Sequence, residues 1–115
     1  MMAKNLAPEW LDLGPVSQVP LRGARSLSVA GGEDIAVFRT SDDRIYALVN
    51  RCPHKGGPLS DGIVHGRKVA CPLHNWIINL EDGEATGADK GCARAFPVKL
   101  ENGRIYIDMS VAAAP

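Results

Sequence analysis

The sequence predicts an all-β fold, and three observations carry that prediction. Short apolar segments alternate with polar residues along the chain, at a spacing typical of antiparallel strands. The 12 glycines and 8 prolines fall largely between these segments, where turns are needed. No stretch repeats its apolar residues with the period of a helix. We therefore expect about nine or ten short strands, which pack as an antiparallel sandwich or a small barrel.

Glycine, proline and aspartate set the ends of the strands expected in the first half of the chain. Gly14-Pro15 interrupts the first apolar segment, and residues 16–23 are expected to form a loop with at most one helical turn. Gly31-Gly32 predicts a hairpin, and the Ser-Asp-Asp sequence at 41–43 predicts a second chain reversal. The strands expected in this half are residues 9–13, 25–29, 35–39 and 45–50.

Hairpin signals set the strand ends in the second half. Gly66-Arg67 separates Ile63-Val64-His65 from Lys68-Val69-Ala70, as expected for a short hairpin. Asn102-Gly103 between alternating segments is among the strongest short hairpin signals. Residues 81–83, Glu-Asp-Gly, close another strand, and residues 89–92 are expected to form a loop. The strands expected in this half are residues 63–65, 68–70, 76–80, 96–100 and 104–107.

Length and composition exclude several classes of protein. The 115 residues fit one domain, expected at residues 9–109, with flexible tails at 1–8 and 110–115. Thirteen basic residues balance thirteen acidic ones, so charge gives no reason to expect a nucleic acid or membrane partner. No apolar run approaches the roughly 20 residues of a membrane span. Three cysteines, an odd number, argue against a disulfide scaffold, and we expect a cytoplasmic protein.

The chemistry is concentrated between Cys52 and His74. One short segment reads Cys52-Pro53-His54, the other reads Cys71-Pro72-Leu73-His74, and sixteen residues lie between His54 and Cys71. Proline and glycine beside these residues permit the sharp turns that ligands of one metal centre require. Two cysteines and two histidines suit tetrahedral zinc as well as an iron–sulfur centre. The residues therefore predict a metal site and leave the metal open.

Each short segment carries one cysteine and one histidine, and this mixed pairing resembles the Rieske family. The resemblance covers residues 9–108 and implies a Rieske-type antiparallel β-sandwich, with a small cluster-binding subdomain at about residues 51–76. It implies a [2Fe–2S] cluster with Cys52 and Cys71 on one iron and His54 and His74 on the other. The protein would transfer one electron at a time, and no catalytic residue is expected on this chain.

Histidine ligation also predicts the reduction potential. Two neutral imidazoles in place of thiolates raise the potential of such clusters into a range of about −150 to +300 mV. High-potential members of the family carry two extra cysteines, at positions matching Gly57 and Leu73, and hydroxyl donors at positions matching Trp76 and Ile78. This chain has none of the four, so we expect a potential at the low end of the range.

The residues around the ligands resemble the small subunit of assimilatory NAD(P)H-dependent nitrite reductase. The likeness lies in residues 50–59 and 71–76, where Asn75 replaces the glycine that Rieske ferredoxins usually carry. It implies a large flavin- and siroheme-containing partner subunit that reduces nitrite to ammonium in nitrate assimilation. A first alternative is a free Rieske ferredoxin that carries electrons from a reductase to a ring-hydroxylating oxygenase. A second alternative is a zinc-stapled interaction module without a redox role.

Several other residues have less specific interpretations. His65 is expected to be a surface residue, and Cys92 a small buried hydrophobe more than a reactive thiol. Lys55 could dock an acidic partner, tune the cluster or be solvated, and Trp76 is expected to pack beneath the cluster more than to shield it or mediate contact. Two arginines are expected to be solvated, and three carboxylates fall in turns and form no catalytic pair: Arg51, Arg67, Asp61, Asp82 and Asp89.

Overall fold

A computed structural model describes residues 9–29, 33–53, 56–72, 76–86 and 91–110. These residues form strands and two short 3-10 helices, and none of their helices is long and apolar enough to cross a membrane. The elements are β1 (Trp10–Pro15), η1 (Val16–Gln18), β2 (Gly23–Leu27), β3 (Ile35–Arg39), β4 (Ile45–Val49), η2 (Leu59–Asp61), β5 (Ile63–His65), β6 (Lys68–Ala70), β7 (Ile77–Asn79), β8 (Ala95–Phe96), β9 (Val98–Glu101) and β10 (Arg104–Asp108). The all-β prediction is confirmed.

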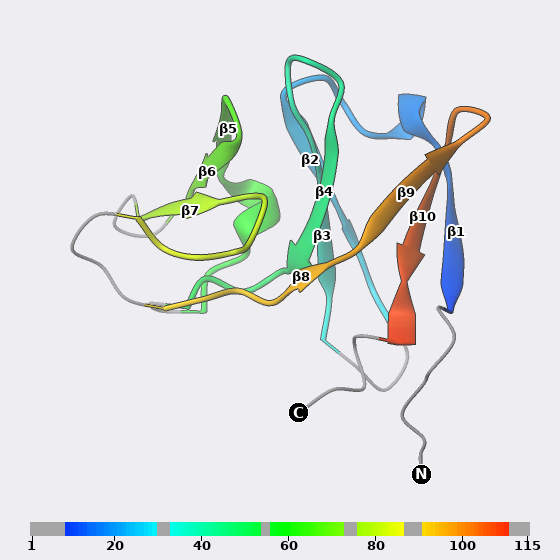
Figure 1. Cartoon of the computed structure of the whole chain (residues 1–115). Helices are drawn as coiled ribbons and strands as arrows, with labels where there is room; N and C mark the ends of the chain where they lie inside the picture. Colours follow the sequence, from blue (N-terminus) through cyan, green and yellow to red (C-terminus); the bar gives the residue numbers. More distant parts are fainter. Residues whose placement is uncertain (1–8, 30–32, 54–55, 73–75, 87–90, 111–115) are drawn as a thin grey trace, which may run out of the picture.

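The described strands form three antiparallel sheets, shown in Figure 1. One has the order β1-β10-β9, a second has the order β2-β3-β4-β8, and a third has the order β5-β6-β7. The third sheet lies on the opposite side of the molecule from β1, β9 and β10, with the second sheet between them (Figure 1). The two predicted hairpin strands at residues 63–65 and 68–70 match β5 and β6 in full.

The first strand does not break where the sequence predicted. β1 continues through Gly14 and Pro15, and its pairing with β10 shifts register between Asp12 and Gly14. Gly14 adopts a φ of +100°, a conformation that glycine reaches without strain, and its N–H donates to Asp12 Oδ1 at 2.9 Å. The Gly-Pro pair therefore makes a β-bulge, which lets the strand bend and keep its partner.

The predicted strand at residues 96–100 is also wrong as a single element. Pro97 divides it into β8, which pairs with β4, and β9, which pairs with β10. Proline has no N–H to give to a ladder, so a strand interior tolerates it poorly. Pro97 is thus the point at which the chain passes from the second sheet to the first.

Strand β3 is buried on both faces because each face of the second sheet packs against a separate core. Ala36 and Phe38 point to one core, and Ile35 and Val37 point to the other. The first core also holds Leu48 of β4 together with residues from η2, β5, β6 and β7. Strand β3 therefore separates the two cores, and one of its faces packs against the third sheet.

Candidate metal centre

Cys52 lies in a tight loop that follows strand β4. Within this loop, residues 52–57, the Cys52 N–H donates to the Gly57 carbonyl at 2.8 Å, and the Gly56 N–H donates to the Cys52 carbonyl at 2.8 Å. Gly56 has a φ of +75°, which closes the loop at little cost because glycine has no β-carbon. Both backbone polar groups of Cys52 are satisfied inside the loop, so the loop holds the cysteine in one position.

Cys71 follows strand β6 and begins the connection to β7. Its N–H donates to the carbonyl of Trp76 at 2.7 Å, and this bond holds the two ends of the connection together. Its side chain is completely buried, and the indole of Trp76 is half-buried against the same core. Trp76 thus packs against the same core as the two cysteines.

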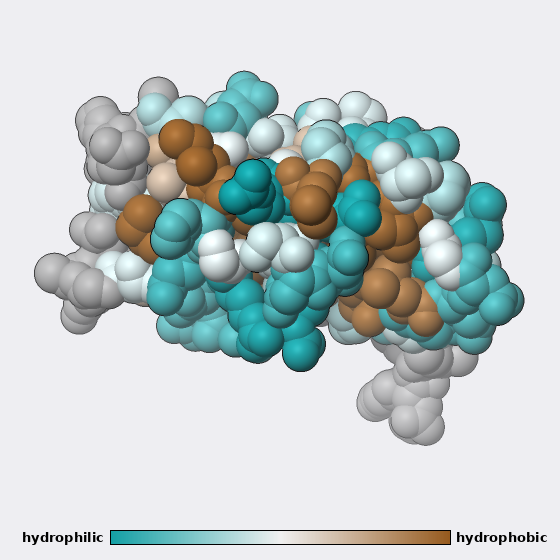
Figure 2. All heavy atoms as spheres, turned by 90° about the horizontal axis from the view of Figure 1, so that it is seen from above, coloured by the Kyte–Doolittle hydropathy of each residue, from teal (hydrophilic) through white to brown (hydrophobic). Residues whose placement is uncertain are grey.

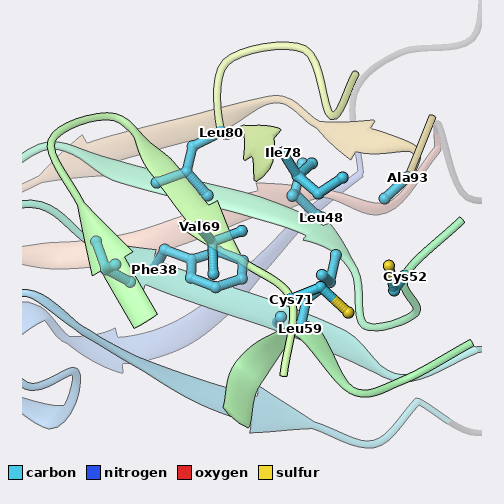
Figure 3. Packing of buried hydrophobic residues seen from close by; sticks show 11 residues of the cluster. Phe38, Leu48, Cys52, Leu59, Val69, Cys71, Ile78, Leu80 and Ala93 are labelled. Carbon is cyan, nitrogen blue, oxygen red and sulfur yellow. The ribbon is translucent and has the colours of Figure 1, made fainter. Parts of the chain in front are cut away.

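The structure brings both cysteines into one apolar cluster. Cys52 is 2% exposed and Cys71 is 0% exposed, and neither forms a disulfide. Figure 3 shows the two sulfur atoms at the same end of this cluster, away from Phe38 and Leu80. Apolar surroundings disfavour a bare thiolate, whereas coordination to a metal stabilises one. Two thiols placed in this way fit the sulfur ligands of an iron–sulfur or zinc centre.

The structure describes only part of the predicted ligand set. His54, His74 and Lys55 lie outside the described residues, as does Leu73. His65, which was expected at the surface, is indeed exposed at the end of β5. Over the described ranges, no group of three or more histidine, cysteine, aspartate or glutamate residues comes together.

Asn50 ties the Cys52 loop to helix η2, a role that sequence reasoning missed. Its side-chain Nδ2 donates to Ser60 Oγ at 2.9 Å, and its Oδ1 accepts from the Ser60 N–H at 2.8 Å. The two bonds fix the segment just before Cys52 against the segment that leads to β5. Asparagine is suited to this because one amide both donates and accepts. The sequence signal was an Asn at a strand end, which by itself indicates only a turn.

A third segment, residues 83–93, packs against both cysteine-bearing loops in its described parts. Its two sides are joined by a bridge between Glu84 and Cys92 and by a hydrogen bond of 3.0 Å from the Ala85 N–H to the Gly91 carbonyl. A β-carbon on Gly91 would lie 2.8 Å from Cβ of Pro53 and 3.8 Å from the Trp76 ring. Gly91 therefore lets this segment approach the two loops closely.

Cys92 does not behave as predicted, because its side chain is exposed. Partial burial, followed by the negative charges of Glu84 and Asp82, raises the pKa of its thiol. The thiol also lies 3.6 Å from the carbonyl oxygen of Asp82. A raised pKa lowers the thiolate fraction, so the thiol is a poor nucleophile at neutral pH.

The two arginines expected to be solvated take part in exposed ion pairs. Arg51 Nη1 lies 3.1 Å from Glu33 Oε1, and Arg67 lies 3.4 Å from Asp42 and 3.8 Å from Glu81. Arg67 thereby joins the β5–β6 turn to the β3–β4 turn. The side-chain hydrogen bond from Thr40 is the largest cause that lowers the pKa of the Asp42 carboxyl, and Arg67 adds a smaller contribution. This carboxyl therefore stays charged at neutral pH.

Comparison with known proteins supports the same kind of centre. The ferredoxin component of the naphthalene 1,2-dioxygenase system of Pseudomonas aeruginosa is 31% identical over 106 residues, which cover 91% of this chain and 100% of that protein. The anthranilate 1,2-dioxygenase ferredoxin subunit of Burkholderia cepacia is 32% identical over 114 residues, which cover 94% of this chain and 99% of that protein.

Solved structures share the fold. A chain from the complex of reduced oxygenase and oxidised ferredoxin in carbazole 1,9a-dioxygenase superposes with a TM-score of 0.78 at 26% identity, over 86% of this chain and 92% of that chain. A Mycobacterium tuberculosis protein given as an NADH-dependent nitrite reductase small subunit superposes with a TM-score of 0.79 at 23% identity, over 88% and 95% of the two chains. The second likeness shows the fold alone.

The sequence also matches the Rieske [2Fe-2S] domain family over residues 9–97. This match spans most of the chain and includes both cysteine-bearing loops. The match favours a [2Fe–2S] cluster over a zinc-stapled module, a distinction that the two buried thiols do not make by themselves. The chain belongs to the Rieske [2Fe-2S] domain family, binds a [2Fe–2S] cluster and serves in electron transfer.

Proposed function

We propose that this protein is a Rieske ferredoxin that delivers electrons to a ring-hydroxylating oxygenase. The observation that carries the proposal is the similarity to ferredoxin components of dioxygenase systems. The alignments cover at least 99% of the length of the two relatives described above. A protein that matches such a ferredoxin from end to end has the size and shape for the same task. The function of a free ferredoxin is thus preferred over that of a nitrite reductase small subunit.

Cys52, His54, Cys71 and His74 would hold the cluster. When bound, the cluster supplies a centre that takes up and releases one electron at a time. The chain contributes a dry pocket for the two thiolates, since Cys52 and Cys71 are almost fully buried among apolar side chains. Two backbone hydrogen bonds, to Gly57 and from Gly56, hold Cys52 in place for this role.

The potential would lie at the low end of the Rieske range, about −150 to +300 mV. Ile78 is fully buried in the apolar core and offers no donor to a cluster sulfur. Gly57 is buried and carries no side chain that could form a disulfide bridge between the loops. Fewer hydrogen bonds to sulfur stabilise the reduced state less, and a lower potential suits a carrier that must reduce an oxygenase.

A nitrite reductase small subunit is the second candidate, favoured by Asn75 and by the residues around the ligands. The two candidates differ in their partner, so the deciding experiment is reconstitution. The purified red-brown protein is mixed with NADH and a flavin reductase, and then with either a ring-hydroxylating oxygenase or a siroheme nitrite reductase from the same source. Hydroxylated product that depends on this chain supports the ferredoxin. Nitrite reduction that depends on this chain, without hydroxylation, overturns it.

A further inference from the structure

An apolar cavity of about 150 Å³ lies between the first and second sheets, beside their edge strands β1 and β2. Its floor is formed by Val19, Val37 and Ile105, each of which is at most 2% exposed. Leu13 of β1 and Leu27 of β2, both half-buried, belong to its walls. We call this space the edge cavity.

The topology explains why the two sheets leave a space at this edge. At the opposite edges of the two sheets, Pro97 carries the chain directly from β8 to β9, so the sheets are joined there. At the near edges, β1 and β2 are linked by η1 and a loop. The apolar faces of the two sheets therefore meet less closely beside β1 and β2.

The edge cavity is separate from the candidate metal centre. Val37 belongs to the core between the first and second sheets, whereas its neighbour Phe38 belongs to the core that contains both cysteines. The second sheet thus lies between the edge cavity and the third sheet (Figure 1). A ligand in the edge cavity would occupy a second site, apart from the cluster.

Arg25 places a positive charge at the mouth of this apolar cavity. It pairs with Val37 across the β2–β3 ladder, so the two side chains point to the same face of the sheet. Arg25 is exposed while Val37 is buried, so the guanidinium lies at the mouth and the valine at the floor. Arg25 Nη1 donates at 2.5 Å to Oε1 of Gln18, a neutral amide that holds the guanidinium without cancelling its charge.

The carboxylates of the chain leave this charge available. Within the described part of the chain, the ion pairs join other arginines to aspartate or glutamate and do not include Arg25. Asp12 also lines the edge cavity, but its two carboxylate oxygens accept from Arg104 Nε at 3.1 and 3.2 Å. An anion at the mouth would therefore meet the guanidinium of Arg25 and a carboxylate that another arginine already neutralises.

A small molecule fits the edge cavity better than a protein segment. An apolar cavity of about 150 Å³ holds a benzene-sized molecule, whereas a specific protein interface buries about 800 Å² on each partner. Figure 2 shows that hydrophobic side chains on the face seen from above form separate groups among hydrophilic ones. That face therefore offers no continuous apolar patch of the kind that marks a broad docking surface.

We infer that the edge cavity binds a monocyclic aromatic carboxylate, with its ring on the Val37 floor and its carboxylate on Arg25. The apolar floor and walls match the ring. The planar guanidinium matches a carboxylate, which it binds through two parallel hydrogen bonds. Gln18 acts as a positioning residue, since its amide fixes Arg25 over the mouth. The site is additional to the proposed electron-transfer function and does not depend on which redox partner the protein has.

The first experiment titrates the oxidised holoprotein with benzoate and follows methyl resonances by NMR. We expect saturable shifts at Val19, Leu27 and Val37, with a dissociation constant in the millimolar range. Nitrobenzene has the same shape without the charge and should bind about five-fold more weakly, and acetate should give no saturable shift. Absence of saturable benzoate shifts at these methyls, or equal shifts with acetate, overturns the inference. The titration needs no redox partner, so its result is independent of the proposed ferredoxin function.

The second experiment tests the charge at the mouth with variants that keep the cluster absorption. Gln18→Glu sets a competing carboxylate beside Arg25 with almost no change in size, and Arg25→Gln removes the charge. Each should weaken benzoate about five-fold and leave nitrobenzene unchanged. Lys68→Gln, at an exposed position on β6 in the third sheet, removes one positive charge elsewhere and should change neither ligand. Equal weakening of benzoate by the Lys68 and Arg25 variants would show a general charge effect and overturn the carboxylate site.

The third experiment tests the ring pocket. Val37→Ile adds a methyl group to the floor and should weaken benzoate and nitrobenzene alike, because less space is left for the ring. Leu27→Phe, at the half-buried wall, makes the same test in case the floor does not accept the added methyl group. Unchanged binding of both ligands in a folded variant of either kind would show that the ring does not enter the edge cavity, and the inference would fall.

Discussion

The carbonyl oxygen of Ala93 lies where a β-carbon on Gly83 would have to go. Gly83 also has a φ of +76°, and its carbonyl accepts a hydrogen bond of 2.8 Å from the Ala93 N–H. The two ends of the segment at residues 83–93 are therefore in direct backbone contact. This contact sets the path of the segment that packs against the Cys52 and Cys71 loops.

Gly83→Ala should destabilise the protein strongly, because it adds a steric clash with backbone to the cost of a left-handed φ. We expect a loss of about 3 kcal/mol or more in the free energy of unfolding, measured by urea denaturation. Gly66→Ala is the matched control, since Gly66 has a φ of +61° and open space around it. It should cost only about 1 kcal/mol. Equal losses in the two variants would show that the contact with Ala93 is not tight.

Asn50→Ala should loosen the Cys52 loop by removing both hydrogen bonds to Ser60. We expect a loss of about 1–3 kcal/mol and faster bleaching of the cluster colour in urea. Ser60→Ala removes only the bond from Asn50 Nδ2 and should have a smaller effect on both readouts. If Ser60→Ala bleaches as fast as Asn50→Ala, the backbone bond to Oδ1 contributes nothing and the explanation is incorrect.

His54→Cys and His74→Cys should each lower the reduction potential, because a thiolate adds negative charge where a neutral imidazole stood. The expected change is on the order of 100 mV, measured by spectroelectrochemistry on variants that keep the cluster. His65→Cys, at an exposed position on β5, is the control and should leave the potential unchanged. An unchanged potential in intact His54 and His74 variants would remove these two residues from the ligand set.

Cys92 should react slowly with iodoacetamide at neutral pH, and its rate should keep rising as the pH passes the ordinary pKa of a thiol. The physical cause is that partial burial and the charges of Glu84 and Asp82 raise the pKa of the thiol. Glu84→Gln removes one of these charges, so it should lower the pKa and speed alkylation at any pH below it. Glu81→Gln, whose carboxylate pairs with Arg67, should leave the rate unchanged. Faster alkylation in both variants would point to a general loosening of the segment.

The strand pattern was predictable wherever local signals and tertiary packing agree. The hairpin of β5 and β6 follows from two short segments on either side of Gly66-Arg67, and the hairpin of β9 and β10 follows from Asn102-Gly103. The sequence misled at Pro97 and at Gly14, where one residue type has two structural uses. Proline can end a strand or move it to another sheet, and glycine can break a strand or bulge it.

The cysteine pair was predictable because residue types and their spacing indicate a metal site. The residues that hold the cysteine-bearing loops in place were not predictable, since they depend on contacts between distant segments. Asn50 meets Ser60, Gly91 meets Pro53, and Arg51 meets Glu33, and no spacing rule links the members of any of these pairs. Cys92 was predicted wrongly for the same reason, because a lone cysteine carries no signal about which side of the chain is covered.

The double burial of β3 has a consequence for protein engineering. Phe38 and Ala36 form part of the apolar wall against which the cysteine-bearing loops pack, yet both belong to a strand outside residues 51–76. A transplant of residues 51–76 into a foreign scaffold would arrive without that wall. The cluster-binding segment is therefore not a portable module, and a successful graft must carry β3 and β4 or recreate their inward-facing side chains in the host.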